Sequence, residues 1–261
     1  MDLNLRGRVA LVTGSYRGTG ESIARVLAAE GANVIVHGVL QGDGDFLASE
    51  IGAEVVWGDI GSEAGCQQLA AQLGESVNGV DILVNNYGGA GAGRWLRSSE
   101  QDWLASYQKN VLSAVRLIQL VVPGMRQRGW GRIVQLGTIG SHQPNSIMPE
   151  YYAAKGALAT MSVSLAKELS GSGITVNTIS PGYIRTAEVE QSLRKRAAKK
   201  GWGDSWEAIV EQVVQSDFPN PCGRIAEREE VADLVAFICS DRAGFINGQN
   251  IRIDGGAVCY V

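Results

Sequence analysis

The alternation of short apolar runs with helical segments is the feature that most restricts the fold of this 261-residue chain. Apolar runs at residues 8–14, 33–38, 53–59, 80–86, 131–138, 174–182 and 247–256 have the length of buried strands. Helical periodicity lies between them, as at 20–31, 63–73, 102–129 and 150–171. Because apolar strands that alternate with helices form parallel sheets covered on both faces, we expect a doubly wound α/β sandwich with a seven-stranded, mainly parallel sheet.

The sequence as a whole predicts a single domain over residues 1–261. Residues 186–220 break the alternation and are polar and helical, which predicts an insertion over the site rather than a second domain. A net charge of −4 argues against binding to nucleic acid or to an anionic membrane. There is no membrane-spanning apolar run and no signal peptide pattern, so we expect a cytoplasmic protein. The four scattered cysteines and two histidines predict buried or incidental thiols and no metal site.

Three glycines mark the junction between the first predicted strand and the helix that follows it. Gly14, Gly18 and Gly20 lie where the run "RVALVTG" gives way to helical periodicity. In an open parallel sheet, ligands bind beyond the carboxyl ends of the strands, where a helix N-terminus attracts phosphate. Glycine allows the phosphate to approach the backbone closely. The pattern favours a dinucleotide-binding turn, and a turn that serves packing alone is the alternative.

Further motifs follow in order along the chain. Asp59 ends the third strand, and "NNYGG" covers Asn85–Gly89 with Tyr87 in place of the usual alanine. Asn110 stands in "KNV". Tyr151 and Lys155 form Y-x-x-x-K, and "PGYIRT" covers Pro181–Thr186. With the turn at Thr13 and Gly14, these motifs resemble the classical short-chain dehydrogenase/reductase family, including its 3-oxoacyl-ACP reductase-like members, over essentially the whole chain. The resemblance implies a Rossmann-type fold and an NAD(P)-dependent oxidoreductase.

The resemblance also implies which residues bind the cofactor. They belong to the glycine turn, to the ends of the second, third and fourth strands, to Y-x-x-x-K and to the segment after the sixth strand, with Asp59 toward the adenine. These residues are Gly14, Ser15, Tyr16, Arg17, Gly18, Thr19, Gly20, His37, Asp59, Ile60, Asn86, Gly88, Tyr151, Lys155, Pro181, Gly182, Ile184 and Thr186.

Four residues are expected to carry the chemistry: Asn110, Thr138, Tyr151 and Lys155. Tyr151 and Lys155 are one helical turn apart, and a lysine cation and an oxidised nicotinamide would both lower the pKa of the phenol from its usual value of about 10. Where the family has a serine thirteen residues before the tyrosine, this chain has Thr138, which keeps the hydroxyl. Ser141 is a less favoured substitute. By resemblance, Asn110 holds a water that passes protons from Lys155.

The end of the second strand predicts the choice of nicotinamide cofactor. NAD-binding folds usually carry an acid there, whereas this chain has Gly38, and so we expect no carboxylate to repel a 2′-phosphate. Arg17 lies where many NADP-using relatives carry a base, and His37 offers a further donor. Val39 stands against this view, because an arginine there would strengthen it. We therefore expect NADP, with NAD, and Arg17 as an ordinary surface residue, as the alternative.

By resemblance, the substrate contacts come from the loops after the fourth, fifth and sixth strands. Trp95, His142 and Tyr183 are the candidates there, and for His142 an ordinary loop residue is the favoured alternative. Trp202 and Trp206 form either an apolar lid or a contact that docks the insertion. The basic run at 193–200 is either a solvated helix face or a binding surface for an acidic handle such as an acyl carrier or coenzyme A.

The function predicted from these residues is hydride transfer between NADP(H) and a small-molecule carbonyl or secondary alcohol, with Tyr151 as acid and base. The alternative is a dinucleotide-binding regulator without catalysis, which Thr138 alone favours. The family resemblance further implies a homo-oligomer, either a dimer or a tetramer.

Overall fold

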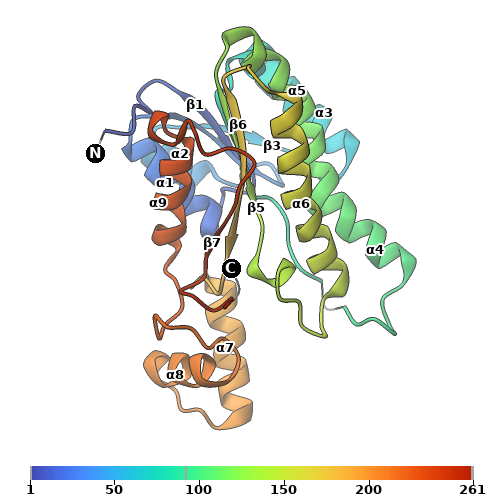
Figure 1. Ribbon diagram of the computed structural model, residues 1–261, viewed down its shortest axis with the longest axis vertical. Coiled ribbons are helices and arrows are strands. Elements are labelled where there is room, and N and C mark those ends of the chain that lie inside the picture. The colour runs from blue at the N-terminus through green and yellow to red at the C-terminus, as the bar shows by residue number, and fades with distance from the viewer. Residues whose placement is uncertain (1, 92, 260–261) are drawn as a thin grey trace.

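The computed structural model describes residues 2–91 and 93–259 and has one seven-stranded sheet at its centre (Figure 1). The strand order is β3-β2-β1-β4-β5-β6-β7, and every neighbouring pair is parallel. The strands are β1 Val9–Val12, β2 Asn33–Gly38, β3 Glu54–Trp57, β4 Ile82–Asn85, β5 Gly131–Leu136, β6 Ile174–Pro181 and β7 Asn250–Ile253. The predicted doubly wound sheet is confirmed, and most strands are shorter than the apolar runs because their ends bend into turns.

Helices cover both faces of the sheet. α1 (Gly18–Ala29), α2 (Asp45–Ile51) and α9 (Arg228–Cys239) lie on one face, while α3 (Glu63–Leu73), α4 (Glu100–Tyr107), α5 (Ser113–Arg128) and α6 (Pro149–Glu168) lie on the other (Figure 1). Short 3-10 helices occupy Gly74–Gly79, Ile139–Ser141 and Asp241–Ala243. Among the described residues, no helix combines the length and apolar character needed to cross a bilayer.

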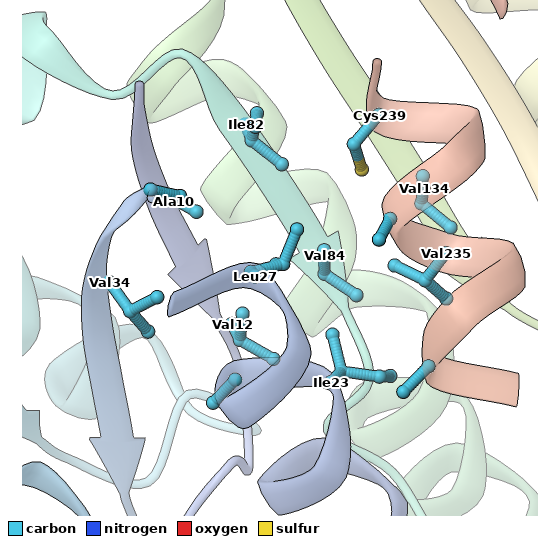
Figure 2. Packing of buried hydrophobic residues seen from close by; sticks show 14 of the residues in the cluster. Ala10, Val12, Ile23, Leu27, Val34, Ile82, Val84, Val134, Val235 and Cys239 are labelled. Carbon is cyan, nitrogen blue, oxygen red and sulfur yellow. The ribbon is translucent and has the colours of Figure 1, made fainter. Parts of the chain in front are cut away.

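Alternating strand residues feed two separate cores. On one face Ile23 and Leu27 of α1 pack with Val235 of α9 over Val12 and Val84 (Figure 2). The opposite core contains residues such as Leu11, Leu83, Leu117 and Ile133. Each fully buried aliphatic side chain contributes about 1.5–3 kcal/mol relative to an exposed one. The two cores therefore hold the strand ends, and the loops they carry, in fixed register.

Three features differ from the sequence-based expectation. The segment at 102–129 is expected to be one helix, but a π-helical turn at Gln108–Leu112 separates α4 from α5. The helices α2 and α9 were not expected, because α2 is a single short element and the periodicity of α9 directly follows the insertion. In all three places the spacing of apolar residues along the sequence was not enough to predict the helix type or the helix boundaries.

The segment after β6 forms a small helical unit beyond the carboxyl ends of the strands (Figure 1). It contains α7 (Ala187–Lys200) and α8 (Trp206–Ser216) and has its own apolar cluster. The buried members of that cluster are Leu193, Ala197, Ile209, Val213, Phe218 and Ile225. The predicted helical character of the insertion is confirmed.

Candidate active site

The turn between β1 and α1 lies where the strand order changes direction. β1 pairs with β2 on one side and with β4 on the other, so its carboxyl end opens between the two halves of the sheet. Gly14 and Gly18 have φ angles of +60° and +62°, which favour glycine. A Cβ on Gly20 would lie 2.7 Å from the Gly14 carbonyl oxygen. No side chain of the described residues caps α1 at Arg17, so the turn fits the pyrophosphate of a dinucleotide.

His37 lies directly behind this turn. Its Nδ1 accepts a hydrogen bond from the Gly14 N–H at 2.9 Å, and its Nε2 donates to the Gly58 carbonyl oxygen at 2.9 Å. This pattern requires a neutral ring, and burial lowers the pKa of His37 below its usual value. The structure therefore corrects the expectation that His37 donates to the cofactor, because both ring nitrogens are already bonded within the chain.

The loop after β4 ties the turn to the middle of the sheet. The Asn86 amide donates to the carbonyl oxygens of Thr13 at 2.8 Å and of Gly14 at 3.2 Å. The Tyr87 N–H donates to Thr13 Oγ1 at 2.8 Å, and the Tyr87 hydroxyl donates to Asp59 Oδ1 at 2.6 Å. The tyrosine that replaces the usual alanine thus connects two predicted cofactor-binding segments.

The end of β2 carries a carboxylate that the sequence pattern does not indicate. Asp43 Oδ2 accepts hydrogen bonds from the N–H groups of Val39 at 3.0 Å and Leu40 at 2.9 Å. The strand itself ends in Gly38 and carries no acid, as expected, but a carboxylate lies close to its end. This acid comes from a loop five residues beyond Gly38, and only the fold of that loop returns it to the strand end.

Tyr151 and Lys155 lie on the first two turns of α6 beside the end of β5. Lys155 is 4% exposed, its Nζ donates to the Leu136 carbonyl oxygen at 2.6 Å, and it lies 6.0 Å from the centroid of the Tyr151 ring. Burial raises the pKa of Tyr151 to about 12 and lowers the pKa of Lys155 to about 8. Burial and the neighbouring Tyr152 thus raise the phenol pKa, whereas the lysine cation and an oxidised nicotinamide were together expected to lower it.

Asn110 stands in the π-helical turn and is 1% exposed. Its Oδ1 accepts from the Gly89 N–H at 3.0 Å, and its Nδ2 donates to the carbonyl oxygens of Gly89 and Ser106, both at 3.0 Å. A Cβ on Gly88 would lie 2.6 Å from Asn110 Oδ1 and 3.2 Å from Lys155 Nζ. The structure therefore brings Asn110 and Lys155 together around Gly88, and the Asn110 side chain fixes this loop.

A cavity of about 550 Å³ opens in front of the Tyr151 phenol. Thr138 and Tyr183 line it, as expected from the sequence, and Thr138 Oγ1 accepts from the Gly140 N–H at 3.2 Å. Ser141 instead donates its hydroxyl to the Thr138 carbonyl oxygen. The lining also includes residues of the two loops expected to contact substrate, after β5 and after β6, namely Gln143, Asn145, Met148, Asp217 and Phe218, and in addition Tyr152 of α6. The Tyr152 hydroxyl accepts a hydrogen bond from the Asn145 amide at 3.0 Å.

Two predicted substrate residues lie elsewhere. Trp95 is 67% exposed and packs on Trp103 with their ring centroids 5.3 Å apart. His142 Nε2 pairs with the Asn250 amide at 2.8 Å. Neither side chain lines the cavity in front of Tyr151. The loops that carry both residues follow the expected strands, but their side chains turn toward neighbouring elements.

The insertion uses its aromatic and basic side chains largely within itself. Trp202 and Trp206 pack against its apolar cluster, which favours docking over a lid. In the basic run, Leu193 and Ala197 are buried, Arg194 pairs with Glu190, and Arg196 pairs with Asp217. The run is therefore one face of an amphipathic helix whose arginines are partly neutralised by nearby acids.

The other predicted cofactor residues lie in different environments. Ser15 is buried and donates its hydroxyl to the Val12 carbonyl oxygen, and Ile60 belongs to the core. Thr186 caps α7, and Gly182 lines the cavity. The remaining residues, Tyr16, Thr19, Pro181 and Ile184, lie in the turn, in α1 and at the end of β6 and beyond it. The side chains of Ser15 and Ile60 therefore lie in the protein interior.

The doubly wound sheet, the glycine turn at its switch point and the Tyr151–Lys155 pair beside a cavity define a dinucleotide-dependent oxidoreductase fold. The model of the enoyl-(acyl carrier protein) reductase family matches residues 14–258. The chain belongs to the classical short-chain dehydrogenase/reductase family, and with it to the NAD(P)-dependent oxidoreductases of carbonyl and secondary alcohol groups.

Similar proteins agree with this assignment. The 3-oxoacyl-(acyl-carrier-protein) reductase FabG of Escherichia coli is 33% identical over 260 residues, with 97% of this chain and 98% of that protein covered. The L-sorbose reductase of Gluconobacter frateurii, solved with NADPH and L-sorbose, is 31% identical with a TM-score of 0.91 and full coverage of both chains. A 3-oxoacyl-(acyl-carrier-protein) reductase of Agrobacterium tumefaciens with NADP bound has a TM-score of 0.86 and 31% identity, with 97% of this chain and 95% of that chain covered.

Proposed function

We propose that this protein transfers hydride between NADP(H) and a carbonyl or secondary alcohol group, with Tyr151 as the proton donor and acceptor. The cofactor, when bound, supplies or accepts the hydride. The observation that carries the proposal is the position of the Tyr151 phenol, which lines a cavity of about 550 Å³ and lies beside a buried lysine.

The protonation state of Tyr151 suits carbonyl reduction. Burial holds the pKa of Tyr151 at about 12, so the phenol keeps its proton at neutral pH and can give it to a substrate oxygen. Alcohol oxidation requires the phenolate, which a positive charge on the oxidised nicotinamide and on Lys155 would favour. Lys155 is anchored by the Leu136 carbonyl oxygen and stays within 6.0 Å of the phenol ring centroid.

Thr138 supports this chemistry by orientation. Its hydroxyl oxygen accepts from the Gly140 N–H, which leaves the hydroxyl hydrogen free to donate into the cavity that Thr138 shares with Tyr151. A substrate oxygen bonded to both hydroxyls would be held in one position as its charge develops. Asn110 acts beside them as a positioning residue, because its amide fixes the loop at Gly89.

NADP(H) is the favoured cofactor. Arg17 stands at the start of α1, and its guanidinium lies 3.4 Å from Glu188. Because the Arg17 side chain is well exposed, the guanidinium can turn from Glu188 toward a phosphate. The similar reductases from Gluconobacter frateurii and Agrobacterium tumefaciens were solved with NADPH and NADP. These observations support NADP(H) over NAD(H) as the main hydride carrier.

The test compares two adjacent tyrosines that line the same cavity. Tyr151→Phe should lower kcat/KM for NADPH-dependent carbonyl reduction by about 10²–10⁴-fold, which is the usual contribution of a positioned acid. Tyr152→Phe, the matched control, should stay within about tenfold of the parent protein, since only a ring contact and the bond to Asn145 change. Reduction of a panel of ketones, diketones and ketoses is measured through the loss of NADPH absorbance.

Two results would contradict the proposal. If Tyr151→Phe reduces carbonyls at the parent rate, Tyr151 is not the acid. If the parent protein binds NADPH tightly and reduces no member of the panel, the regulator without catalysis is the better description.

A further inference from the structure

Asp43 occupies a position that determines nucleotide choice in this class of fold. In a doubly wound sheet, an acid at the end of the second strand bonds the ribose 2′-hydroxyl of NAD, while a basic residue there accommodates the 2′-phosphate of NADP. β2 ends at Gly38, and the carboxylate of Asp43 lies against the two N–H groups that follow. A negative charge is thus built into the strand end although the strand itself carries none.

The contact between Gly38 and Asp43 is tightly packed. A Cβ on Gly38 would collide with the Cβ of Asp43 and would lie 2.6 Å from its carbonyl oxygen. The side chain of Asp43 therefore begins in the space where a strand-end side chain would begin. The loop supplies the acid from a different point of the chain, and this requires glycine at position 38.

The loop is held in this shape by its own backbone. The Asp43 N–H donates to the Leu40 carbonyl oxygen at 3.0 Å, while Leu40 donates back to the Asp43 carboxylate. Gly42 and Gly44 have φ angles of +92° and +90°, which other residues rarely adopt. Asp43 is consequently a fixed part of the loop rather than a freely rotating surface acid.

The loop also adjoins the glycine turn. A Cβ on Gly44 would lie 3.5 Å from the Cβ of Tyr16, which precedes Arg17. Arg17 is exposed, and its charge is balanced by Glu188 at 3.4 Å. A ribose bound at the end of β2 would therefore have an acid fixed by the β2 loop and a base carried by the turn nearby.

We propose that Asp43 is a specificity-determining residue that limits the preference for NADP(H), by accepting a hydrogen bond from the ribose hydroxyls of NAD(H) and repelling the 2′-phosphate. This inference rests on the proposed dinucleotide-dependent function. Arg17 and Asp43 then act in opposite directions, and the protein uses NADH as well as NADPH.

The test is equilibrium binding of NADPH and NADH, measured by nucleotide fluorescence. Asp43→Asn should tighten NADPH at least tenfold and weaken NADH a few-fold, because the charge is lost while an amide oxygen can still accept from the loop N–H groups. Asp45→Asn is the control of equal charge change, since Asp45 is exposed in the first turn of α2 and makes neither bond. Its ratio of the two dissociation constants should change less than about threefold.

Competition by 2′-AMP and 5′-AMP isolates the ribose site from the rest of the cofactor. Asp43→Asn should tighten 2′-AMP and leave 5′-AMP nearly unchanged, and Asp43→Ser serves if the amide variant is poorly folded. The inference is overturned if the NADPH-to-NADH ratio is the same in Asp43→Asn and Asp45→Asn. The result is separable from the proposed function, because carbonyl reduction by the parent protein with either nucleotide would still stand.

Discussion

The hydroxyl of Tyr87 donates a 2.6 Å hydrogen bond to Asp59, joining the loop after β4 to the loop after β3. Asp59 Oδ1 also accepts from the Gly61 N–H at 3.0 Å, so one carboxylate oxygen has both its partners within the chain. Burial and the adjacent carboxylate raise the pKa of Tyr87, and the phenol stays a donor throughout the neutral range. The carboxylate is thereby fixed, and in the predicted contact with adenine Oδ2 is the oxygen that would accept from the amino group.

Tyr87→Phe should weaken NADPH binding by about three- to thirtyfold, since a hydrogen bond to a charged group typically contributes about 1.5–3 kcal/mol and this one is partly exposed. The variant should also lose part of its discrimination between adenine and hypoxanthine dinucleotides. Fluorescence titration with both nucleotides measures this. An unchanged adenine preference would show that Asp59 is oriented by Gly61 alone.

Variants of Thr138 test whether a hydroxyl at this position is sufficient for carbonyl reduction. Thr138→Ser should keep kcat/KM within about tenfold, because the donor and acceptor are retained. Thr138→Val, which has nearly the same shape without the hydroxyl, should lose about 10²–10³-fold, as expected for removal of one donor to a developing charge. NADPH affinity should be similar in both variants, and comparable activity in the valine variant would exclude a role for the hydroxyl.

The pH dependence of reduction should follow Lys155. With its pKa lowered to about 8 by burial, Lys155 loses its charge as the pH rises through about 8, and kcat/KM for reduction should fall over that interval. Tyr151, with a pKa of about 12, does not titrate there. The activity that remains in Lys155→Arg should lack this decline up to about pH 9. A parent profile that is flat from pH 7 to 9.5 would contradict the assignment.

Stability should depend on pH through His37. Its pKa is lowered in the folded protein by burial, so the unfolded chain binds more protons once the pH falls below about 6.5. The free energy of unfolding should therefore decrease as the pH is lowered from about 7 to 5, by up to about 1.4 kcal/mol per pH unit. Urea unfolding of His37→Gln should show a smaller slope than the parent. An unchanged slope in His37→Gln would contradict this assignment.

Much of the fold follows from local properties of the chain. Short apolar runs separated by helical segments define a covered parallel sheet, and the run ending at Gly14 locates its phosphate-binding turn. Tyr151 and Lys155 face the same way because they are four residues apart on one helix. These features could be predicted because helix and strand periodicity act over only a few residues.

Side-chain direction within loops was less predictable. Trp95 and His142 occupy the expected loops but pack against Trp103 and Asn250, whereas Tyr152 enters the cavity that they were expected to line. A loop residue has no repeating pattern that fixes which neighbour it meets, so its contacts depend on elements far away in the chain.

The sequence by itself determined the doubly wound sheet, the glycine turn and the Tyr151–Lys155 pair, because each depends on spacing along one segment. Only the tertiary structure decided that the His37 ring is used within the chain and that Asp43 supplies the carboxylate at the end of β2. Both outcomes depend on how loops fold back onto strand ends. Hydrogen bonds between backbone groups and side chains, together with the room left by Gly38, set that geometry.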